Sequence, residues 1–308
     1  MYHPRDIIEV LADNIRKTRN PFGAGNRTVN TWWKKVHPRT QGDTMLYTGL
    51  MYQLAPYIAK TTKQIERFED TALAKYVGLN KYIPKFMVKI GFMFMASAKD
   101  KRRFHAILES IVKILEKSGV DFFYQPKLDF YSGILLYDLG DIDGFIEHAR
   151  FVAEKLKKNG IKKLITVDPH TTYALKVLFP KYTGIHFEVQ TYFELINFKA
   201  SDPGRQVTLH DPCFYGRYLE LSHVPARILQ DFGIENVPVR NSGKFTSCCG
   251  GPAESISPAL TKTILERRYA DLRRTGKPIV TMCPICLGNI IKTGAEVEDL
   301  STVIARCA

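Results

Sequence analysis

Five of the six cysteines in this 308-residue chain fall between positions 210 and 286, in three short motifs. The motifs are His210-Asp211-Pro212-Cys213, Cys248-Cys249-Gly250-Gly251 and Cys283-Pro284-Ile285-Cys286. Gaps of 34 and 33 residues separate their cysteines. Four ligands fill a tetrahedral zinc site, so five thiols exceed what one zinc ion binds. An iron–sulfur cluster suits them better, because its sulfide-bridged irons bind several thiolates at once.

The composition indicates a globular protein of the cytoplasm. Hydrophobic residues make up 45% of the chain, as in soluble globular proteins. No apolar run approaches the roughly 20 residues of a spanning helix. The opening residues lack the apolar stretch of a signal peptide. Thiols stay reduced in the cytoplasm, where clustered cysteines indicate metal or redox chemistry more often than disulfides.

The chain carries a net charge of +13, for which nucleic acid is the obvious partner. It contains no nucleic-acid-binding motif, and its basic residues are spread over several segments, so we expect no nucleic acid partner. Three explanations remain open: a solvated basic surface, docking to acidic partner subunits, and docking to an anionic membrane surface.

Residues 81–103 concentrate this charge, with seven basic side chains and one acidic one. Lys81, Lys85 and Lys89 recur every four residues and would share one helix face, with Phe and Met side chains around the other faces. Two interpretations remain open, namely a helix of the core and a peripheral contact with a membrane surface or a partner's groove.

Residues 1–44 are expected to form a basic N-terminal arm or linker with a short amphipathic helix over 7–16. Asn20-Pro21-Phe22-Gly23 should end that helix, since proline and glycine break helical geometry. The pair Trp32-Trp33 could cap the core or anchor a partner protein, because Trp is enriched at interfaces.

The remainder predicts an α/β fold of two pseudo-repeated, Rossmann-like halves with parallel sheets. Strands are expected at 45–47, 120–123, 164–167, 207–209, 234–239 and 279–282. Helices are expected at 51–67, 107–117, 145–158, 225–231 and from Pro258 to Gly276. Cys213 and Cys283 each follow a strand closely. The carboxyl ends of parallel strands share one sheet edge, so these cysteines should meet there.

An internal repeat supports the two halves. The positions that correspond are Gly133, Gly160 and Asp168 in the first half, and Gly250, Gly276 and Cys283 in the second. The Gly–Gly intervals are 27 and 26 residues, and such agreement indicates duplication. We therefore expect a first repeat over 45–203, with an insertion at about 60–103 and no cysteines, and a second, cluster-binding repeat over 204–308.

Other residues near the cysteines have expected supporting roles. Gly250 and Gly251 should let the backbone approach a cluster closely, and Pro284 should direct a helix whose N–H groups face the sulfurs. The groups expected to tune the site from outside are His210, Arg217 and Ser247. Asp168 and His170, in the first half, are two candidate ligands without a third. Cys307 would be a free thiol, or a redox or ligand residue on a tail.

The three motifs, in this order, resemble the cysteine-rich "CCG" domain over roughly residues 205–305. This domain occurs in the B-type and D-type proteins of heterodisulfide reductase and in iron–sulfur subunits of several dehydrogenases. The segment from Asn20 to Trp32 is similar to the part of the D-type proteins that follows a ferredoxin-like module. The resemblance implies that the five cysteines bind a noncubane [4Fe-4S] cluster, with a cubane cluster or zinc as alternatives. The implied ligands are Cys213, Cys248, Cys249, Cys283 and Cys286.

The resemblance further implies an oxidoreductase subunit that acts on sulfur groups within a heterodisulfide reductase-like complex. Its partners would be a ferredoxin-like iron–sulfur subunit, a flavoprotein subunit, and a thiol, disulfide or lipoyl-type carrier. With one intact motif set, the chain would hold one cluster and not the facing pair of heterodisulfide reductase. Two alternatives remain, namely an iron–sulfur subunit of a membrane-associated hydroxy-acid or succinate dehydrogenase, and a non-catalytic scaffold stabilised by metal.

Overall fold

Two parallel β-sheets form the centre of the protein in a computed structural model, which describes residues 4–68, 96–200, 202 and 204–308. The first sheet has the order β1-β2-β3 and the second has the order β5-β4-β6-β7. The strands of the first sheet are β1 (Thr44–Tyr47), β2 (Lys163–Thr166) and β3 (Glu188–Thr191). Those of the second are β4 (Gln206–Leu209), β5 (Glu235–Asn236), β6 (Ile279–Thr281) and β7 (Val297–Asp299). The predicted α/β class with parallel sheets is confirmed.

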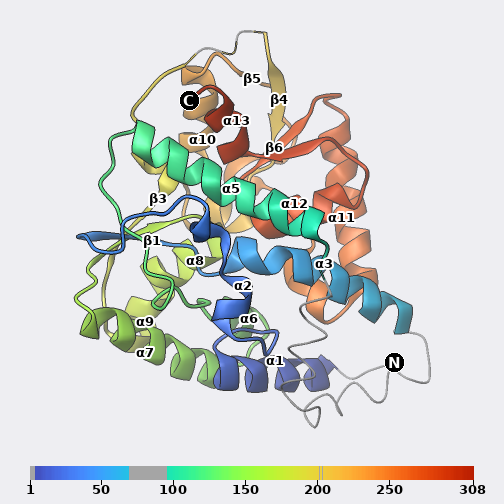
Figure 1. The fold of residues 1–308 in the computed structure, drawn as a ribbon. Coiled ribbons are helices and arrows are strands. Elements are labelled where there is room, and N and C mark those ends of the chain that lie inside the picture. The colour runs from blue at the N-terminus through green and yellow to red at the C-terminus, as the bar shows by residue number, and fades with distance from the viewer. Residues whose placement is uncertain (1–3, 69–95, 201, 203) are drawn as a thin grey trace.

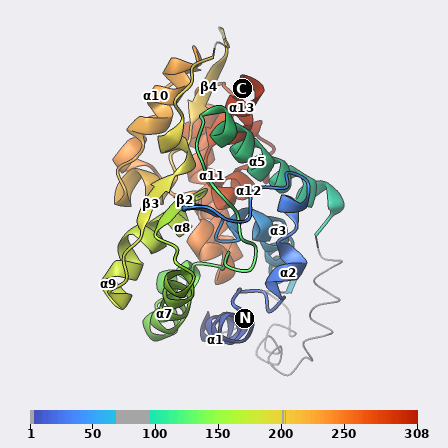
Figure 2. The same ribbon diagram turned by 60° about the vertical axis from the view of Figure 1, so that its left-hand side comes forward.

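Helices surround both sheets. Around the first half lie α1 (Pro4–Thr18), α2 (Asn26–Val29), η1 (Trp32–Lys34), α3 (Met51–Phe68), α5 (Ala98–Lys117), α6 (Ile134–Asp138), α7 (Ile142–Lys158), α8 (Pro169–Tyr173), η3 (Ala174–Leu178), α9 (Phe179–Thr183) and η4 (Tyr192–Leu195). In the second half follow η5 (Phe214–Tyr218), α10 (His223–Asp231), η6 (Gly243–Phe245), η7 (Gly251–Ser255), α11 (Pro258–Arg273), α12 (Pro284–Ile291) and α13 (Leu300–Arg306). Helix α5 packs against both α3 and α13, which joins the two halves (Figures 1 and 2).

Two predicted strands are shorter than expected. The segment 120–123 contributes one parallel bridge, between Met45 and Phe123, because the Val120 N–H bonds the Leu115 carbonyl at the end of α5. The segment 234–239 pairs over two residues, because the Leu209 N–H of β4 donates to the Asn236 side chain and not to the backbone of the next residue. With the Phe123 bridge included, the two sheets have the same strand order, which the proposed duplication would explain; the duplication and its domain boundaries stay a prediction.

Helix α5 begins earlier than the predicted residue 107. The Ser97 side chain caps its N-terminus by accepting a hydrogen bond from the Asp100 N–H, an arrangement that stabilises the first turn. The end of the basic segment, residues 98–103, therefore belongs to a helix that packs on the core. Residues 81–95, which include Lys81, Lys85 and Lys89, lie outside the described residues.

Residues 4–44 pack against the first half. Helix α1 contacts α6 and α7, and the Arg19 guanidinium lies 3.9 Å from the centroid of the Phe151 ring. Trp32 is fully buried, with its ring centroid 5.0 Å from that of Tyr124. Trp32 therefore belongs to the core, as the first of the two interpretations held.

Side chains from both sheets share one hydrophobic core. Ile165 of β2 lies in the same buried cluster as Val207 of β4 and Val280 of β6. Polar contacts also cross between the halves, since the Tyr52 hydroxyl donates to Asp299 at 2.6 Å. The halves are thus packed as one body. Among the described helices, none combines the length and the apolar character needed to cross a membrane.

Asp129 ties the loop after β1 to the core. Its buried carboxylate accepts hydrogen bonds from the N–H groups of Thr48 and Gly49, at 3.1 and 3.0 Å. It also accepts from the hydroxyls of Thr48 and Tyr124, at 2.5 and 2.7 Å. Burial outweighs these bonds and raises the pKa of Asp129 to about 6.

The raised pKa predicts a pH-dependent contribution to stability. The folded protein holds a proton on Asp129 that the unfolded chain releases, so this contribution is complete below about pH 4 and is lost as the pH rises through about 6. Relative to Asp129→Asn, which does not titrate, wild-type unfolding free energy should fall in that window by up to roughly 1.4 kcal/mol per pH unit. Denaturant unfolding across the window measures it, with the exposed Asp143→Asn as control. If the unfolding free energies of wild type and Asp129→Asn changed equally with pH, the prediction would be contradicted.

Candidate metal centre

Neighbouring parallel strands carry the first and third cysteine motifs to one edge. Strand β4 ends at Leu209, and His210 to Cys213 follow it directly. Strand β6 ends at Thr281, and Cys283 follows as the N-cap of α12. Because β4 and β6 pair in parallel, their carboxyl ends meet at the same edge of the sheet. The second motif, Cys248-Cys249, reaches this edge from the loop that follows η6.

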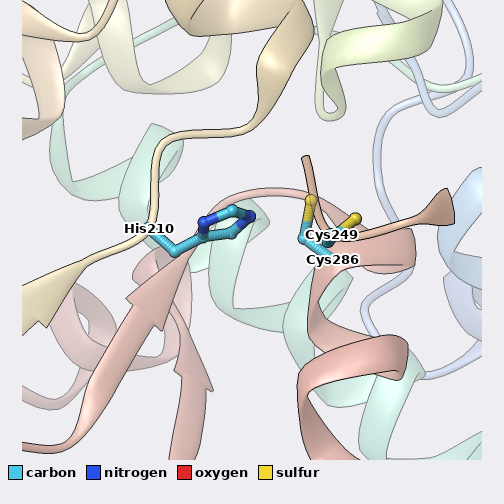
Figure 3. Close-up of side chains that lie close together, drawn as sticks. All are labelled: His210, Cys249 and Cys286. Atoms are coloured by element: carbon cyan, nitrogen blue, oxygen red, sulfur yellow. The ribbon is translucent and has the colours of Figure 1, made fainter. Parts of the chain in front are cut away.

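All five cysteines come together there. Successive thiols are in hydrogen-bonding contact in the order Cys213–Cys248–Cys249–Cys286–Cys283. The Cys249 and Cys286 sulfurs and a ring nitrogen of His210 lie within 4.8 Å of one another (Figure 3). None of the six cysteines, all of which the structure describes, forms a disulfide.

The five sulfurs differ in exposure. Cys249, Cys283 and Cys286 are buried, whereas Cys213 and Cys248 are half-buried. The site therefore has a closed side against α12 and a more open side at Cys213 and Cys248. Among the five thiols, Cys213 and Cys248 are therefore the two most accessible to solvent.

The contacts make some of the thiols hydrogen-bond donors and others acceptors. A hydrogen bond to Cys248, followed by burial, raises the pKa of Cys213. Hydrogen bonds from Cys213 and Cys249 lower the pKa of Cys248. Hydrogen bonds to neighbouring sulfurs, followed by burial, raise the pKa values of Cys249 and Cys286. Full deprotonation would crowd five negative charges together, which bound cations would offset.

Cys283 is the second sulfur that ionises readily. Burial opposes its ionisation, but a hydrogen bond from Cys286 and the charge of His170 lower its pKa to about 6. Burial likewise opposes the charged form of His170, yet Cys283 and Asp168 raise the pKa of His170 well above its usual value. Cys283 and His170 thus each favour the charged form of the other.

His170 brings the first half into the site. Its Nδ1 lies 3.9 Å from the Cys283 sulfur. It is held there by Asp168, which caps α8 by accepting hydrogen bonds from the N–H groups of His170 and Thr171, both at 3.0 Å. Asp168 and Cys283 are both N-caps followed by proline, so the two positions matched in the sequence have the same local geometry. The two candidate ligands of the first half lie beside the cysteines and do not form a separate site.

Arg217 supports the site indirectly. Its Nε and Nη2 donate to the Thr246 carbonyl, at 3.0 and 2.5 Å. Asp211 holds the same loop, since its carboxylate accepts from the Gly243 N–H at 2.7 Å and its carbonyl accepts from the Thr246 hydroxyl at 2.8 Å. Arg217 was expected to tune the site from outside; through these bonds it fixes the loop that carries Ser247 and Cys248, and its effect on the site stays a prediction.

The two glycines of the second motif have different reasons to be glycine. Gly250 has a positive φ of 87° as the N-cap of η7, a conformation that favours glycine. Its N–H donates to the Cys248 sulfur at 3.3 Å. A Cβ at Gly251 would overlap Cγ2 of Ile285 and lie 3.6 Å from the Cys249 sulfur. Gly251 therefore allows the second motif to pack directly on the third.

Arg268 is a residue of this region that the sequence interpretation missed. It lies on α11, is fully buried, and donates from Nε to His210 Nδ1 at 3.0 Å. A signal was present, since Arg268 falls between the buried Leu265 and Leu272 on one apolar face of the helix. Charged side chains are seldom found at such positions unless they have a partner.

Cys307 is packed elsewhere. It follows α13, its sulfur lies 3.8 Å from the Val303 carbonyl, and it packs against the large core and not against the other cysteines. This placement agrees with a separate free thiol.

The contact between the second and third motifs predicts that Gly251→Ala will disturb the site. The added methyl group must push Ile285 away, which should lower the unfolding free energy by about 1–3 kcal/mol. It should also speed the reaction of Cys249 and Cys286 with a thiol reagent in the reduced, metal-free protein. Gly288→Ala in α12 is the control, because a Cβ there meets open space. Equal behaviour of the two variants would contradict the prediction.

Comparison with known proteins gives one family match and several curated relatives. Residues 207–291 match the model of the cysteine-rich domain, CCG. The chain is 29% identical over 221 residues to a probable membrane-anchored ferredoxin of Chromohalobacter salexigens, covering 64% of this chain and 33% of the relative. It is also 29% identical over 221 residues to the EtfAB:quinone oxidoreductase of Syntrophomonas wolfei, covering 65% and 31%.

A third relative is the D-type protein of the dihydromethanophenazine:CoB–CoM heterodisulfide reductase of Methanosarcina barkeri. It is 29% identical over 217 residues, which cover 63% of this chain and 53% of the relative. The chain thus spans between about a third and about half of the length of these relatives. The resemblance to the CCG cysteine-rich domain, and through it to heterodisulfide reductase proteins, is confirmed, with residues 207–291 as the matching segment.

Proposed function

We propose that this chain is an iron–sulfur electron-transfer subunit of a heterodisulfide reductase-like complex. The observation that carries the proposal is the contact of five thiols from three separate loops at one sheet edge. The residues that would hold the cluster are Cys213, Cys248, Cys249, Cys283 and Cys286. Bound there, an iron–sulfur cluster would accept and release single electrons.

The donor set fits a cluster of several irons. Five sulfurs exceed the four ligands of one zinc ion. Adjacent residues such as Cys248 and Cys249 cannot easily both bind one iron, but they can bind neighbouring irons, which favours a cluster. A noncubane [4Fe-4S] cluster is the form that uses all five thiols, and the resemblance to heterodisulfide reductase supports it.

The open side of the site supports action on a sulfur substrate. Beside Cys213, the rings of Phe214 and Tyr218 lie with centroids 5.1 Å apart, and Tyr218 is 57% exposed. Tyr173 completes this aromatic group, 5.1 Å from Phe214. A thiol, a disulfide or a lipoyl-type carrier could rest on these rings and reach the half-buried sulfurs. Reduction of a disulfide to two thiols takes two electrons and two protons, so a ferredoxin-like subunit and a flavoprotein would resupply electrons one at a time.

Metal analysis of cysteine variants tests the proposal. The anaerobically purified protein should contain about four irons and about four acid-labile sulfides per chain, with an electron paramagnetic resonance signal on redox titration. Replacing any one of the five clustered cysteines with Ala should lower the iron content or change the signal, because the proposed cluster uses all five thiols as ligands. Cys307→Ala is the matched control and should leave both unchanged.

Two results would count against this assignment. Zinc in place of iron would favour the scaffold alternative. Full iron content in Cys249→Ala, with an unaltered signal, would show that four thiols are enough and that the cluster is a cubane.

A second candidate function is an electron relay that does not act on sulfur groups. It is favoured by the single set of cysteines and by the similarity to an EtfAB:quinone oxidoreductase. Under this alternative the chain would pass electrons between a flavoprotein and a quinone-linked partner. Contact with a membrane through residues 81–103 would accompany it.

Reoxidation of the reduced protein distinguishes the two candidates. The anaerobic, reduced protein is mixed either with a small disulfide or with a quinone analogue, and loss of the reduced signal is followed. Sulfur chemistry predicts faster reoxidation by the disulfide, with two thiols formed for every two electrons lost. A relay predicts reoxidation by the quinone alone.

A further inference from the structure

Arg268 is a charged side chain in an unusual place. It lies on α11, the residue is fully buried, and its guanidinium is close enough to Cys249 and Cys286 to interact with their charge. It forms no ion pair at close range among the described residues; its Nη1 donates to the Asn241 carbonyl at 2.7 Å, and its Nη2 has no hydrogen-bond partner there. The carboxylates of Asp211 and Asp271 stabilise its charge more than the two cysteines do, but from beyond ion-pair distance. A buried cation without a direct ion pair is costly.

The hydrogen bond from Arg268 to His210 fixes the protonation of the imidazole ring. Arg268 Nε donates to His210 Nδ1 at 3.0 Å. A guanidinium can only donate, so Nδ1 must accept with its lone pair and carries no proton. The proton of the neutral imidazole is then on Nε2. Arg268 therefore selects one of the two tautomers of His210.

The selected N–H faces the sulfurs. His210 Nε2 is buried and has no hydrogen-bond partner among the described residues. Figure 3 shows the ring directed at Cys249 and Cys286, whose sulfurs lie within 4.8 Å of its ligand atom and of each other. A buried, unpartnered N–H donor next to two sulfurs has thiolate or sulfide as its natural acceptor.

We propose that Arg268 is a positioning residue that holds His210 as an N–H donor to the sulfur site and prevents it from binding the metal. The inference rests on the proposed function for the identity of the acceptor, a thiolate or sulfide of the cluster. A metal on Nε2 would require Nδ1 to carry the proton. That proton would point at the N–H of Arg268, so two donors would face each other.

Metal-binding histidines show the opposite arrangement. Their second nitrogen normally donates to a carboxylate or a carbonyl, which fixes the tautomer that leaves a lone pair for the metal. At His210 the second nitrogen meets a donor. The ligand atoms of His210, Cys249 and Cys286 are close enough together to hold an ion. In the proposed arrangement, only the two cysteines are ligands, and His210 is a hydrogen-bond donor.

The arrangement should raise the midpoint potential of the site. Reduction adds negative charge to the sulfurs, and both an N–H directed at them and a buried cation behind it stabilise that charge. Arg268→Met keeps the length and apolar stem of the side chain while it removes the donor and the charge. Arg268→Lys keeps a charged donor. The exposed Arg267→Met, one residue earlier on α11, is the matched control.

The tautomer is tested in the metal-free protein, so that the result does not depend on iron. Long-range proton–nitrogen correlation spectra of nitrogen-15 histidine-labelled protein report which ring nitrogen carries the proton. We expect Nε2 of His210 to be protonated in wild type, Arg267→Met and Arg268→Lys, and a mixture of tautomers in Arg268→Met. Protonation of Nδ1 in the wild type would overturn the inference, even if Arg268→Met failed to fold.

The iron-loaded protein supplies the second measurement. Arg268→Met should shift the midpoint potential to a more negative value, with Arg268→Lys closer to wild type and Arg267→Met unchanged. Pulsed electron paramagnetic resonance should detect only a weak nitrogen-14 coupling in the wild type. Strong coupling there would show His210 bound to iron and refute the donor role. A wild type that binds no iron would refute the proposed function, while the tautomer spectra would still decide the role of Arg268.

Discussion

The crowding of five sulfurs at one sheet edge is the constraint on which the rest of the second half depends. Neighbouring sulfurs can form hydrogen bonds with one another only while some of them keep the proton that is donated. The alternation of raised and lowered pKa values along Cys213, Cys248 and Cys249 expresses this limit. Such a site favours multiply charged cations. Around the three buried sulfurs, the neighbouring residues supply hydrogen-bond donors and positive charge.

The surroundings are built from both halves of the chain. His170 arrives from the end of β2 in the first sheet, and His210 from the end of β4 in the second. The first half has no cysteines, but its helix α8 also begins at an N-cap followed by proline, with Asp168 where the second half has Cys283. In this chain, the half without cysteines contributes a histidine to the neighbouring site.

Much of this could be predicted from the sequence, for identifiable reasons. The strands before Cys213 and Cys283 are short apolar runs, and a parallel pairing brings their ends together whatever the details of packing. The Ser257-Pro258 start of α11 has the side-chain hydrogen bond that its residue types predict. The lengths of the strands at 120–123 and 234–239 were overestimated. The hydrogen bonds that shorten them, from Val120 to the end of α5 and from Leu209 to the Asn236 side chain, depend on tertiary placement.

The parts of the site that were missed depend on contacts distant in sequence. His170 and Cys283 are 113 positions apart, and Arg268 and His210 are 58 apart. No helix or strand repeat in the sequence predicts contacts between residues so far apart. The contact of Arg217 could not be predicted for a related reason. A basic residue near a cysteine motif can face the sulfurs or a nearby carbonyl, and the path of the loop directs Arg217 to the Thr246 carbonyl.

The graded burial of the sulfurs has a consequence for how such a protein matures. The five sulfurs come from three loops that are close only once β4 and β6 have paired, so the proposed cluster would be assembled on a chain whose second half is already folded. Cys213 and Cys248, the two half-buried thiols, would then be the first ligands that incoming iron meets. Oxygen would reach the assembled cluster at the same two thiols.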